Sequence, residues 1–111
     1  MKLDSEHSGD TIVIRALDDR IDAAGAIQFK ERMREIVAVP SKRVVLDMSK
    51  VSFLDSSGLG AVVSVMKARG PLRRLELSGL TPTVEKVFRL TRMDSVFIIH
   101  KAMPQDLRHA S

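Results

Sequence analysis

The sequence predicts an α/β fold with a mixed, mostly parallel sheet, and two observations carry this prediction. A weakly alternating segment and a short β-branched run open the chain, and the apolar segments after them alternate between helical and strand-like spacing. The predicted order is strand, strand, helix, strand, helix, strand, helix, strand. Right-handed crossovers between the later strands make their pairing parallel, while the first two strands form an antiparallel hairpin.

The hairpin is predicted at the N-terminus. Lys2 to Glu6 alternates weakly between apolar and polar residues, and Thr11 to Leu17 is rich in β-branched residues. The turn-forming residues Ser8 to Asp10 lie between them. We therefore expect two adjacent strands joined by a tight turn.

An amphipathic helix is predicted over about residues 23–38. Its apolar residues recur at i, i+4, i+7 and i+8, namely Phe29, Met33, Ile36 and Val37. Asp22 is placed to cap the first free backbone amides, and Pro40 ends the helix.

The central segment predicts a buried strand followed by a second helix. Arg43 to Met48 is apolar without clean alternation, which is typical of a strand covered on both faces. A second apolar run, Val51 to Leu54, leads into the small polar cluster Asp55 to Gly60. The helix then extends to Gly70, with a predicted core face of Leu59, Val62, Val63 and Met66.

The last part of the chain predicts a strand, a helix and a final strand. The strands are Leu72 to Ser78 and Ser95 to Ile99. Between them Thr81 is suited to be an N-cap and Pro82 the first helical residue, and the buried face is predicted to comprise Val84, Val87 and Phe88. The folded core is expected to cover about residues 2–103 of one domain spanning 1–111, with 104–111 a polar tail of at most one helical turn.

Composition excludes several classes of function. The formal net charge is +4, but basic residues alternate with acidic ones and only four aromatic residues are present, all Phe, so direct nucleic-acid binding is not expected. No cysteine is present, which excludes a disulfide scaffold and thiolate metal sites. No apolar run approaches the roughly 18 to 20 residues of a spanning helix, so we expect a cytoplasmic protein without membrane insertion.

The cluster Asp55 to Gly60 is the segment where chemistry is expected. Ser56 and Ser57 place two hydroxyls at the first turn of a helix, where free amides and the helix dipole stabilise negative charge. Gly58 and Gly60 lack side chains and would let another protein or a nucleotide approach closely. The alternative is that a serine only caps the helix and the glycines only allow close packing on the sheet.

One stripe of this helix is predicted to face away from the core. On a wheel of 100° per residue the stripe consists of Ser57, Gly60, Ser64 and Lys67. Since Gly60 leaves space on this stripe, we expect a partner protein to bind there.

The segment from Val44 to Gly60 resembles the signature of STAS domains, particularly the stand-alone bacterial anti-sigma factor antagonists. The resemblance extends to the loop Leu17 to Asp22, to the later loop Ser78 to Pro82, and to the element order of nearly the whole chain. It implies a single STAS-type domain that binds proteins. Asp22, which ends the first loop, is then expected in the partner-binding surface.

The resemblance also implies a phosphorylation switch at Ser56. In that family the serine after the motif's aspartate is phosphorylated by a GHKL-type serine kinase that is also the anti-sigma factor, and a PP2C-type serine phosphatase reverses the modification. The unphosphorylated antagonist binds the anti-sigma factor, which releases a sigma factor and so regulates transcription. Asp55, Ser57 and Gly58 form the environment of Ser56. Asp55 would orient the Ser56 hydroxyl or serve only as a turn residue, and Ser57 would be an N-cap or an alternative acceptor.

Other functions are disfavoured by the same residues. A serine nucleophile needs a general base, but the histidines lie at positions 7, 100 and 109, and no Gly-x-Ser-x-Gly elbow is present. No pattern of metal ligands, phosphate loop or dinucleotide motif occurs, so neither an enzyme nor a cofactor is predicted. The runner-up function is a STAS regulatory subunit of a membrane transport system or a stress-signalling scaffold.

Overall fold

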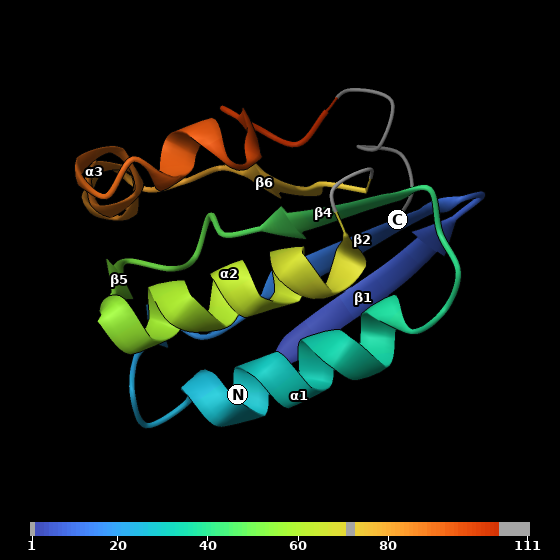
Figure 1. The fold of residues 1–111 in the computed structure, drawn as a ribbon, viewed down its shortest axis with the longest axis horizontal. Coiled ribbons are helices and arrows are strands. Elements are labelled where there is room, and N and C mark those ends of the chain that lie inside the picture. The colour runs from blue at the N-terminus through green and yellow to red at the C-terminus, as the bar shows by residue number, and fades with distance from the viewer. Residues whose placement is uncertain (1, 71–72, 105–111) are drawn as a thin grey trace.

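A computed structural model describes residues 2–70 and 73–104, in which a five-stranded sheet has the order β1-β2-β4-β6-β7 (Figure 1). The strands are β1 (Leu3–Ser8), β2 (Thr11–Ala16), β4 (Arg43–Asp47), β6 (Leu75–Ser78) and β7 (Ile98–His100). β1 and β2 pair in antiparallel fashion and every other pairing in this sheet is parallel. The predicted fold class is therefore confirmed.

The hairpin turn forms where the sequence predicts it. Ser8 pairs with Thr11, which leaves Gly9 and Asp10 as the two loop residues. Gly9 has a φ of 60°, in the left-handed region that glycine adopts without steric cost. The hairpin makes β1 an edge strand, and β2 connects it to the parallel part of the sheet.

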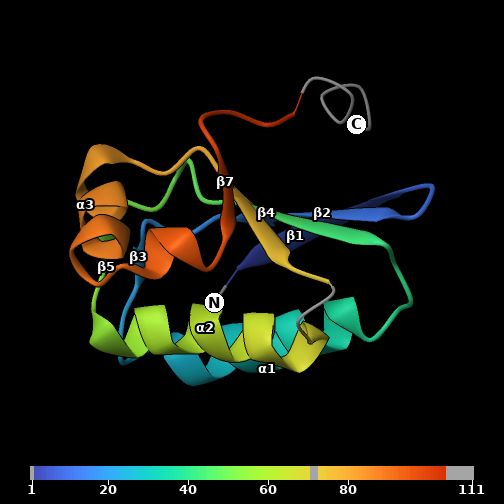
Figure 2. The same ribbon diagram turned by 45° about the horizontal axis from the view of Figure 1, so that its top comes forward.

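Two of the three α-helices form a layer on one face of the sheet. These are α1 (Ala26–Val37) and α2 (Ser56–Arg69), which lie side by side below the strands in Figure 2. The third, α3 (Pro82–Leu90), lies at the end of the molecule beside a small second sheet of β3 (Arg20–Ile21) and β5 (Phe53–Leu54). Both α1 and α2 begin at this end (Figure 1).

The main core lies between the large sheet and its helical layer. Its fully buried residues from the strands are Ile12, Ile14, Val44, Leu46, Leu75 and Leu77, and those from α1 and α2 include Phe29, Met33, Val62 and Val65. Val13 and Val45 are fully buried on the opposite face, where Met103 packs against them. The central strand β4 is thus covered on both faces, as its continuous apolar run predicts.

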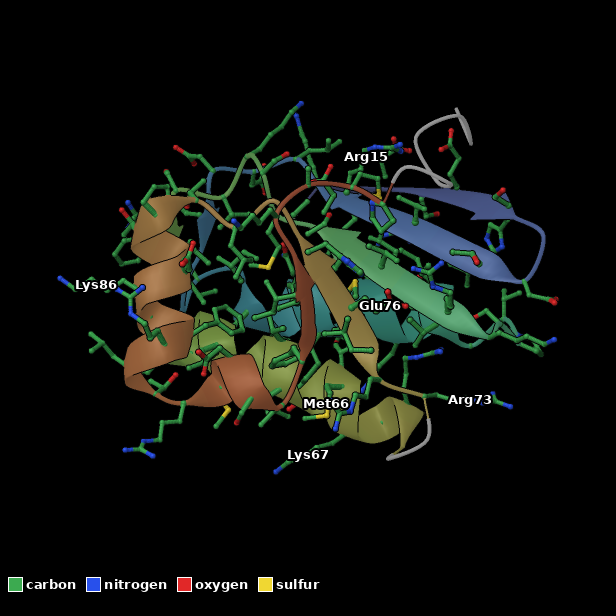
Figure 3. The ribbon with its side chains drawn as sticks, turned by 90° about the horizontal axis from the view of Figure 1, so that it is seen from above. Arg15, Met66, Lys67, Arg73, Glu76 and Lys86 are labelled. Atoms are coloured by element: carbon green, nitrogen blue, oxygen red, sulfur yellow. The ribbon has the colours of Figure 1, made fainter. Side chains whose placement is uncertain are left out.

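A charged cluster lies on the sheet face opposite the helices. Glu76 on β6 accepts hydrogen bonds from Arg43 Nε at 2.9 Å and Nη2 at 2.8 Å, and His100 Nε2 lies 2.8 Å from Glu76 Oε1 (Figure 3). The Arg43 hydrogen bonds, opposed by burial, hold the pKa of Glu76 below its ordinary value. This cluster joins β4, β6 and β7 across three neighbouring strands.

Several predicted boundaries differ from the structure. The helix predicted from residue 23 begins at Ala26, because residues 23–25 form a turn first. The strand predicted over Ser95 to Ile99 is wrong in position: a 3₁₀ turn occupies Met93–Ser95 and β7 covers Ile98–His100. Arg92, with a φ of 60°, precedes the turn, and Phe97 is buried against Phe88 with ring centroids 5.6 Å apart.

The remaining predictions for the C-terminal half hold for the residues that the structure describes. Thr81 is the N-cap residue of α3 and Pro82 the first helical residue, and Val84 and Phe88 are buried. Val87 is half-buried. The strand predicted from Leu72 is β6, which begins at Leu75, and Leu72 itself lies outside the described residues, as does the tail from 105 to 111.

Candidate functional site

The small sheet of β3 and β5 positions the start of α2. Arg20 pairs with Phe53 and Ile21 with Leu54, and both Ile21 and Leu54 are buried. The amides of Ser52 and Phe53 donate to the carbonyl of Asp19 at 2.8 and 3.2 Å. The loop before α1 and the strand before α2 are therefore held together, and α2 starts two residues after Leu54.

Asp55 is the N-cap residue of α2 and also binds the loop that precedes α1. Its Oδ1 accepts from the amide of Gly58 at 2.9 Å, and its Oδ2 accepts from the amide of Ala23 at 3.1 Å. The suggestion that Ser56 or Ser57 caps the helix is wrong, because Asp55 has this role. Both Asp55 oxygens accept from backbone amides, and among the described residues no hydrogen bond joins this carboxylate to the Ser56 hydroxyl.

Ser56 and Ser57 are the first two residues of α2, and both are exposed. Within residues 2–70 and 73–104 neither hydroxyl has a hydrogen-bond partner. The Asp55 side chain caps the amide of Gly58, the third residue of α2, and does not occupy the amides of Ser56 and Ser57. The positive end of the helix dipole lies at this same end of α2. A negatively charged group on Ser56 is electrostatically compatible with this helix end.

The two glycines of the motif have different surroundings. Gly58 is buried, and a Cβ built on it would overlap the carbonyl oxygen of Ile21. The expectation that a partner approaches Gly58 is therefore wrong, since β3 of the same chain already occupies that space. Gly60 is exposed and a Cβ there would meet nothing within 4 Å, so this position is open to a partner.

The exposed stripe of α2 is where the helical wheel places it. Ser57, Gly60 and Lys67 are exposed and Ser64 is half-buried. The core face is rotated from the prediction: its buried residues are Gly58, Ala61, Val62 and Val65. Of the predicted core residues only Val62 is buried, while Leu59, Val63 and Met66 are half-buried and flank the core.

A groove between α1 and α2 adjoins this stripe, a feature that the sequence analysis missed. It has a volume of about 350 Å³ and is lined by Ala26, Ile27, Lys30, Ser57, Gly60, Ala61 and Ser64. Ile27 and Lys30 come from α1, three residues apart on the same side of that helix. Phe29 and Met33 of the same helix face the core. The positions of Ile27 and Lys30 on the helical wheel, away from Phe29 and Met33, are the signal that could have identified a second exposed stripe.

Asp22 lies in the loop that Asp55 binds. Its Oδ2 accepts from Arg20 Nε at 3.2 Å, and its Oδ1 accepts from the amide of Ala24 at 3.1 Å. The bond from Arg20 is the main cause that lowers the pKa of Asp22. The Arg20 guanidinium also lies 4.2 Å from the centre of the Phe53 ring. Asp22 caps the turn before α1, and Gly25 occupies the N-cap position of the helix itself.

The described part of the chain contains no group of three His, Cys, Asp or Glu side chains able to hold a metal ion. Among the same residues no helix combines the length and the apolar character needed to cross a bilayer.

Comparisons with known proteins agree on one family. The family model described as the STAS domain matches residues 2–105. BtrV of Bordetella bronchiseptica, named as a candidate anti-sigma factor antagonist, is 30% identical over 89 residues, which cover 79% of this chain and 77% of BtrV.

Solved structures show the same fold. An anti-sigma factor antagonist from Mycobacterium paratuberculosis is 21% identical and superposes with a TM-score of 0.85, covering 98% of this chain and 92% of that chain. The antagonist SpoIIAA in its unphosphorylated form is 25% identical, with a TM-score of 0.66 over 88% of this chain and 87% of that chain. The phosphorylated form of the Bacillus SpoIIAA gives a TM-score of 0.61 at 25% identity, covering 88% of this chain and 90% of that chain.

Proposed function

This chain belongs to the STAS domain family, as the segment from Val44 to Gly60 predicts, and we propose that it is an anti-sigma factor antagonist switched by phosphorylation of Ser56. The single observation that carries the proposal is the exposed Ser56 hydroxyl at the first position of α2, which has no hydrogen-bond partner among the described residues. The names of its relatives, and the existence of SpoIIAA in two phosphorylation forms, support the same function.

In the unphosphorylated state, the start of α2 and the exposed stripe along it bind the anti-sigma factor, which then releases its sigma factor. This surface comprises Asp22 beside the start of α2, Gly60 and Ser64 along the helix, and Lys67 in its last turn. Three of these positions are on α2, and Asp22 is brought to the same end by the bond between Asp55 and Ala23. The flat, glycine-containing stripe of α2 allows a partner backbone to approach closely.

Phosphorylation changes the charge of this surface without a need for refolding. A GHKL-type kinase transfers the terminal phosphoryl group of ATP to Ser56 Oγ: the Oγ–P bond forms, the bond from the γ-phosphorus to ADP breaks and ADP is released, and a general base of the kinase takes the serine hydroxyl proton. The phosphate carries about −1.5 to −2 charges, beside the carboxylate of Asp55. The helix N-terminus tolerates this charge, but a closely packed partner would have to desolvate it. A PP2C-type phosphatase restores the binding state.

Mapping of the modified residue tests the switch directly. Each anti-sigma kinase of the source organism is incubated separately with this protein and ATP. We expect one of them to add a single phosphate to Ser56, which intact-mass and peptide mass spectrometry would detect and locate. Phosphate that maps to Ser57, or that persists in Ser56→Ala, would show that the wrong hydroxyl is assigned. Binding to a transporter subunit with no modification by any kinase would favour the runner-up function.

The affinity of two variants tests the effect of charge. We expect Ser56→Ala to bind the cognate kinase like the wild type and Ser56→Asp to bind at least about 30-fold more weakly, since one uncompensated charge in an interface costs about 2–5 kcal/mol. Ser5→Asp, which adds the same charge on the exposed edge strand β1, is the matched control and should bind normally. Calorimetric titrations that give equal affinities for the two Ser56 variants would exclude this surface as the interface with the kinase. A phosphorylated sample of the wild type, measured alongside, checks whether Ser56→Asp reproduces the effect of phosphoserine.

A further inference from the structure

We propose that the groove between α1 and α2 receives a segment of the anti-sigma factor that carries an apolar side chain next to a carboxylate. The proposal rests on the function above and adds a second helix, α1, to the binding surface. Two residues of α1 give the groove its character, Ile27 and Lys30, and neither was part of the surface predicted from the sequence.

The groove is continuous with the phosphorylation site. Ser57 lines it and directly follows Ser56 in α2. A kinase that reaches the Ser56 hydroxyl therefore covers the near end of the groove. The floor consists of small residues from both helices, namely Ala26, Gly60, Ala61 and Ser64, so the volume of about 350 Å³ is open to side chains of the partner.

Ile27 provides an apolar wall that the fold itself leaves uncovered. Its exposed fraction is 66%, in contrast to Phe29 and Met33 of the same helix, which are fully buried. Burial of such a side chain against an apolar residue of a partner is favourable because it removes apolar surface from water. Contacts of this kind near the centre of an interface carry much of its affinity.

Lys30 determines the charge of the segment that fits. It is half-buried, it lines the groove, and it forms no ion pair within residues 2–70 and 73–104. No acidic residue lines the groove, so the Lys30 ammonium group has no internal counter-charge there. A carboxylate of the partner is its electrostatic complement. The same cation would attract a free phosphate, and the cross-linking experiment below distinguishes a carboxylate of the kinase from a free phosphate.

Charge reversal at Lys30 tests the proposal, with Lys86→Glu as a control that changes the net charge equally. Lys86 is exposed on α3 and points away from the body of the molecule (Figure 3). We expect Lys30→Glu to weaken binding of the kinase identified by Ser56 phosphorylation at least tenfold, Ile27→Asp to do the same, and Lys86→Glu to change it less than twofold. Thermal melts show whether each variant is folded. If Lys30→Glu does not fold, Lys30→Gln replaces it, because it removes the positive charge without reversing it.

Carbodiimide cross-linking identifies the occupant. The reagent joins an amine to a carboxylate in direct contact, so the complex should give a peptide that links Lys30 to an Asp or Glu of the kinase. Normal binding by Lys30→Glu together with no Lys30 cross-link would overturn the groove proposal, while continued phosphorylation of Ser56 would leave the proposed function intact.

Discussion

The inner and outer faces of α2 differ most clearly at two glycines that are two residues apart. Gly58 lies on the inner face, against the carbonyl group of Ile21. A Cβ at this position would overlap that carbonyl group and would lie 2.9 Å from Leu54 Cδ1. Gly60 lies on the outer face, where a Cβ would have open space. The same residue type is therefore required by the fold at one position and available to a partner at the other.

This difference shows how one short motif can serve both folding and the binding that we propose. The inner face brings the start of α2 against β3, and Asp55 fixes the same junction through its bonds to Gly58 and Ala23. The outer face carries Ser56 and the exposed stripe without taking part in the core. Changes on the inner face should alter stability, and changes on the outer face should alter binding.

The largest effect is expected from Gly58→Ala. The added methyl group would overlap the Ile21 carbonyl, and backbone atoms in a paired strand move only at a cost. Overpacking of this kind destabilises by about 1–3 kcal/mol, and contact with the Ile21 carbonyl group as well as the Leu54 side chain places the loss for Gly58→Ala at the upper end, about 3 kcal/mol. Urea unfolding followed by circular dichroism measures the loss. An unfolding free energy equal to the wild type would show that α2 can shift away from β3.

Asp55→Ala should have a smaller effect on the same face. Loss of a capping carboxylate costs about 0.5–2 kcal/mol, and the bond to the amide of Ala23 is lost with it. Asp55→Asn keeps one oxygen that can accept from Gly58 but leaves the second amide without an acceptor, so it should lose less. An unfolding free energy of Asp55→Asn equal to that of the wild type would mean that the link to Ala23 contributes nothing measurable.

The structure of α2 also shows why the sequence predicted its outer face better than its inner one. Spacing predicts an exposed stripe of Ser57, Gly60, Ser64 and Lys67, of which three residues are exposed and Ser64 is half-buried. The inner face was predicted from the large residues, yet Gly58 is buried because the helix approaches β3 closely, and the small Ala61 is buried at the side of α2 that adjoins α1. Side-chain size indicates burial only where the distance between elements is known, and here the distance is set by tertiary contacts.

The fold was predictable to the extent that its elements are long enough to show periodicity. The helices, the hairpin and β4 have clear patterns, whereas β3 and β5 have two residues each, too few to reveal alternation. The groove was missed for a related reason: it is formed by two helices together, and Lys30 becomes notable only when the structure shows that, among the residues it describes, no acidic side chain lines this groove. The identity of Ser56 as the acceptor came from the resemblance of the motif, and it stays a prediction.

The smallest effect on stability is expected from Gly60→Arg, which should nevertheless abolish binding of the anti-sigma factor. Glycine within a helix is about 0.5–1 kcal/mol less favourable than alanine, and Arg is nearly as good a helix former as alanine. Since a side chain at this position meets nothing within 4 Å, the variant should be as stable as the wild type or slightly more so. Its guanidinium would extend from the exposed stripe beside the groove and block a partner sterically. Thermal melts and calorimetric titrations on one preparation measure both quantities, with Gly60→Ala as the control that gains stability while adding only a methyl group. A large fall in melting temperature would mean that the outer face of α2 packs against the fold as the inner face does, and undiminished binding would place the partner elsewhere.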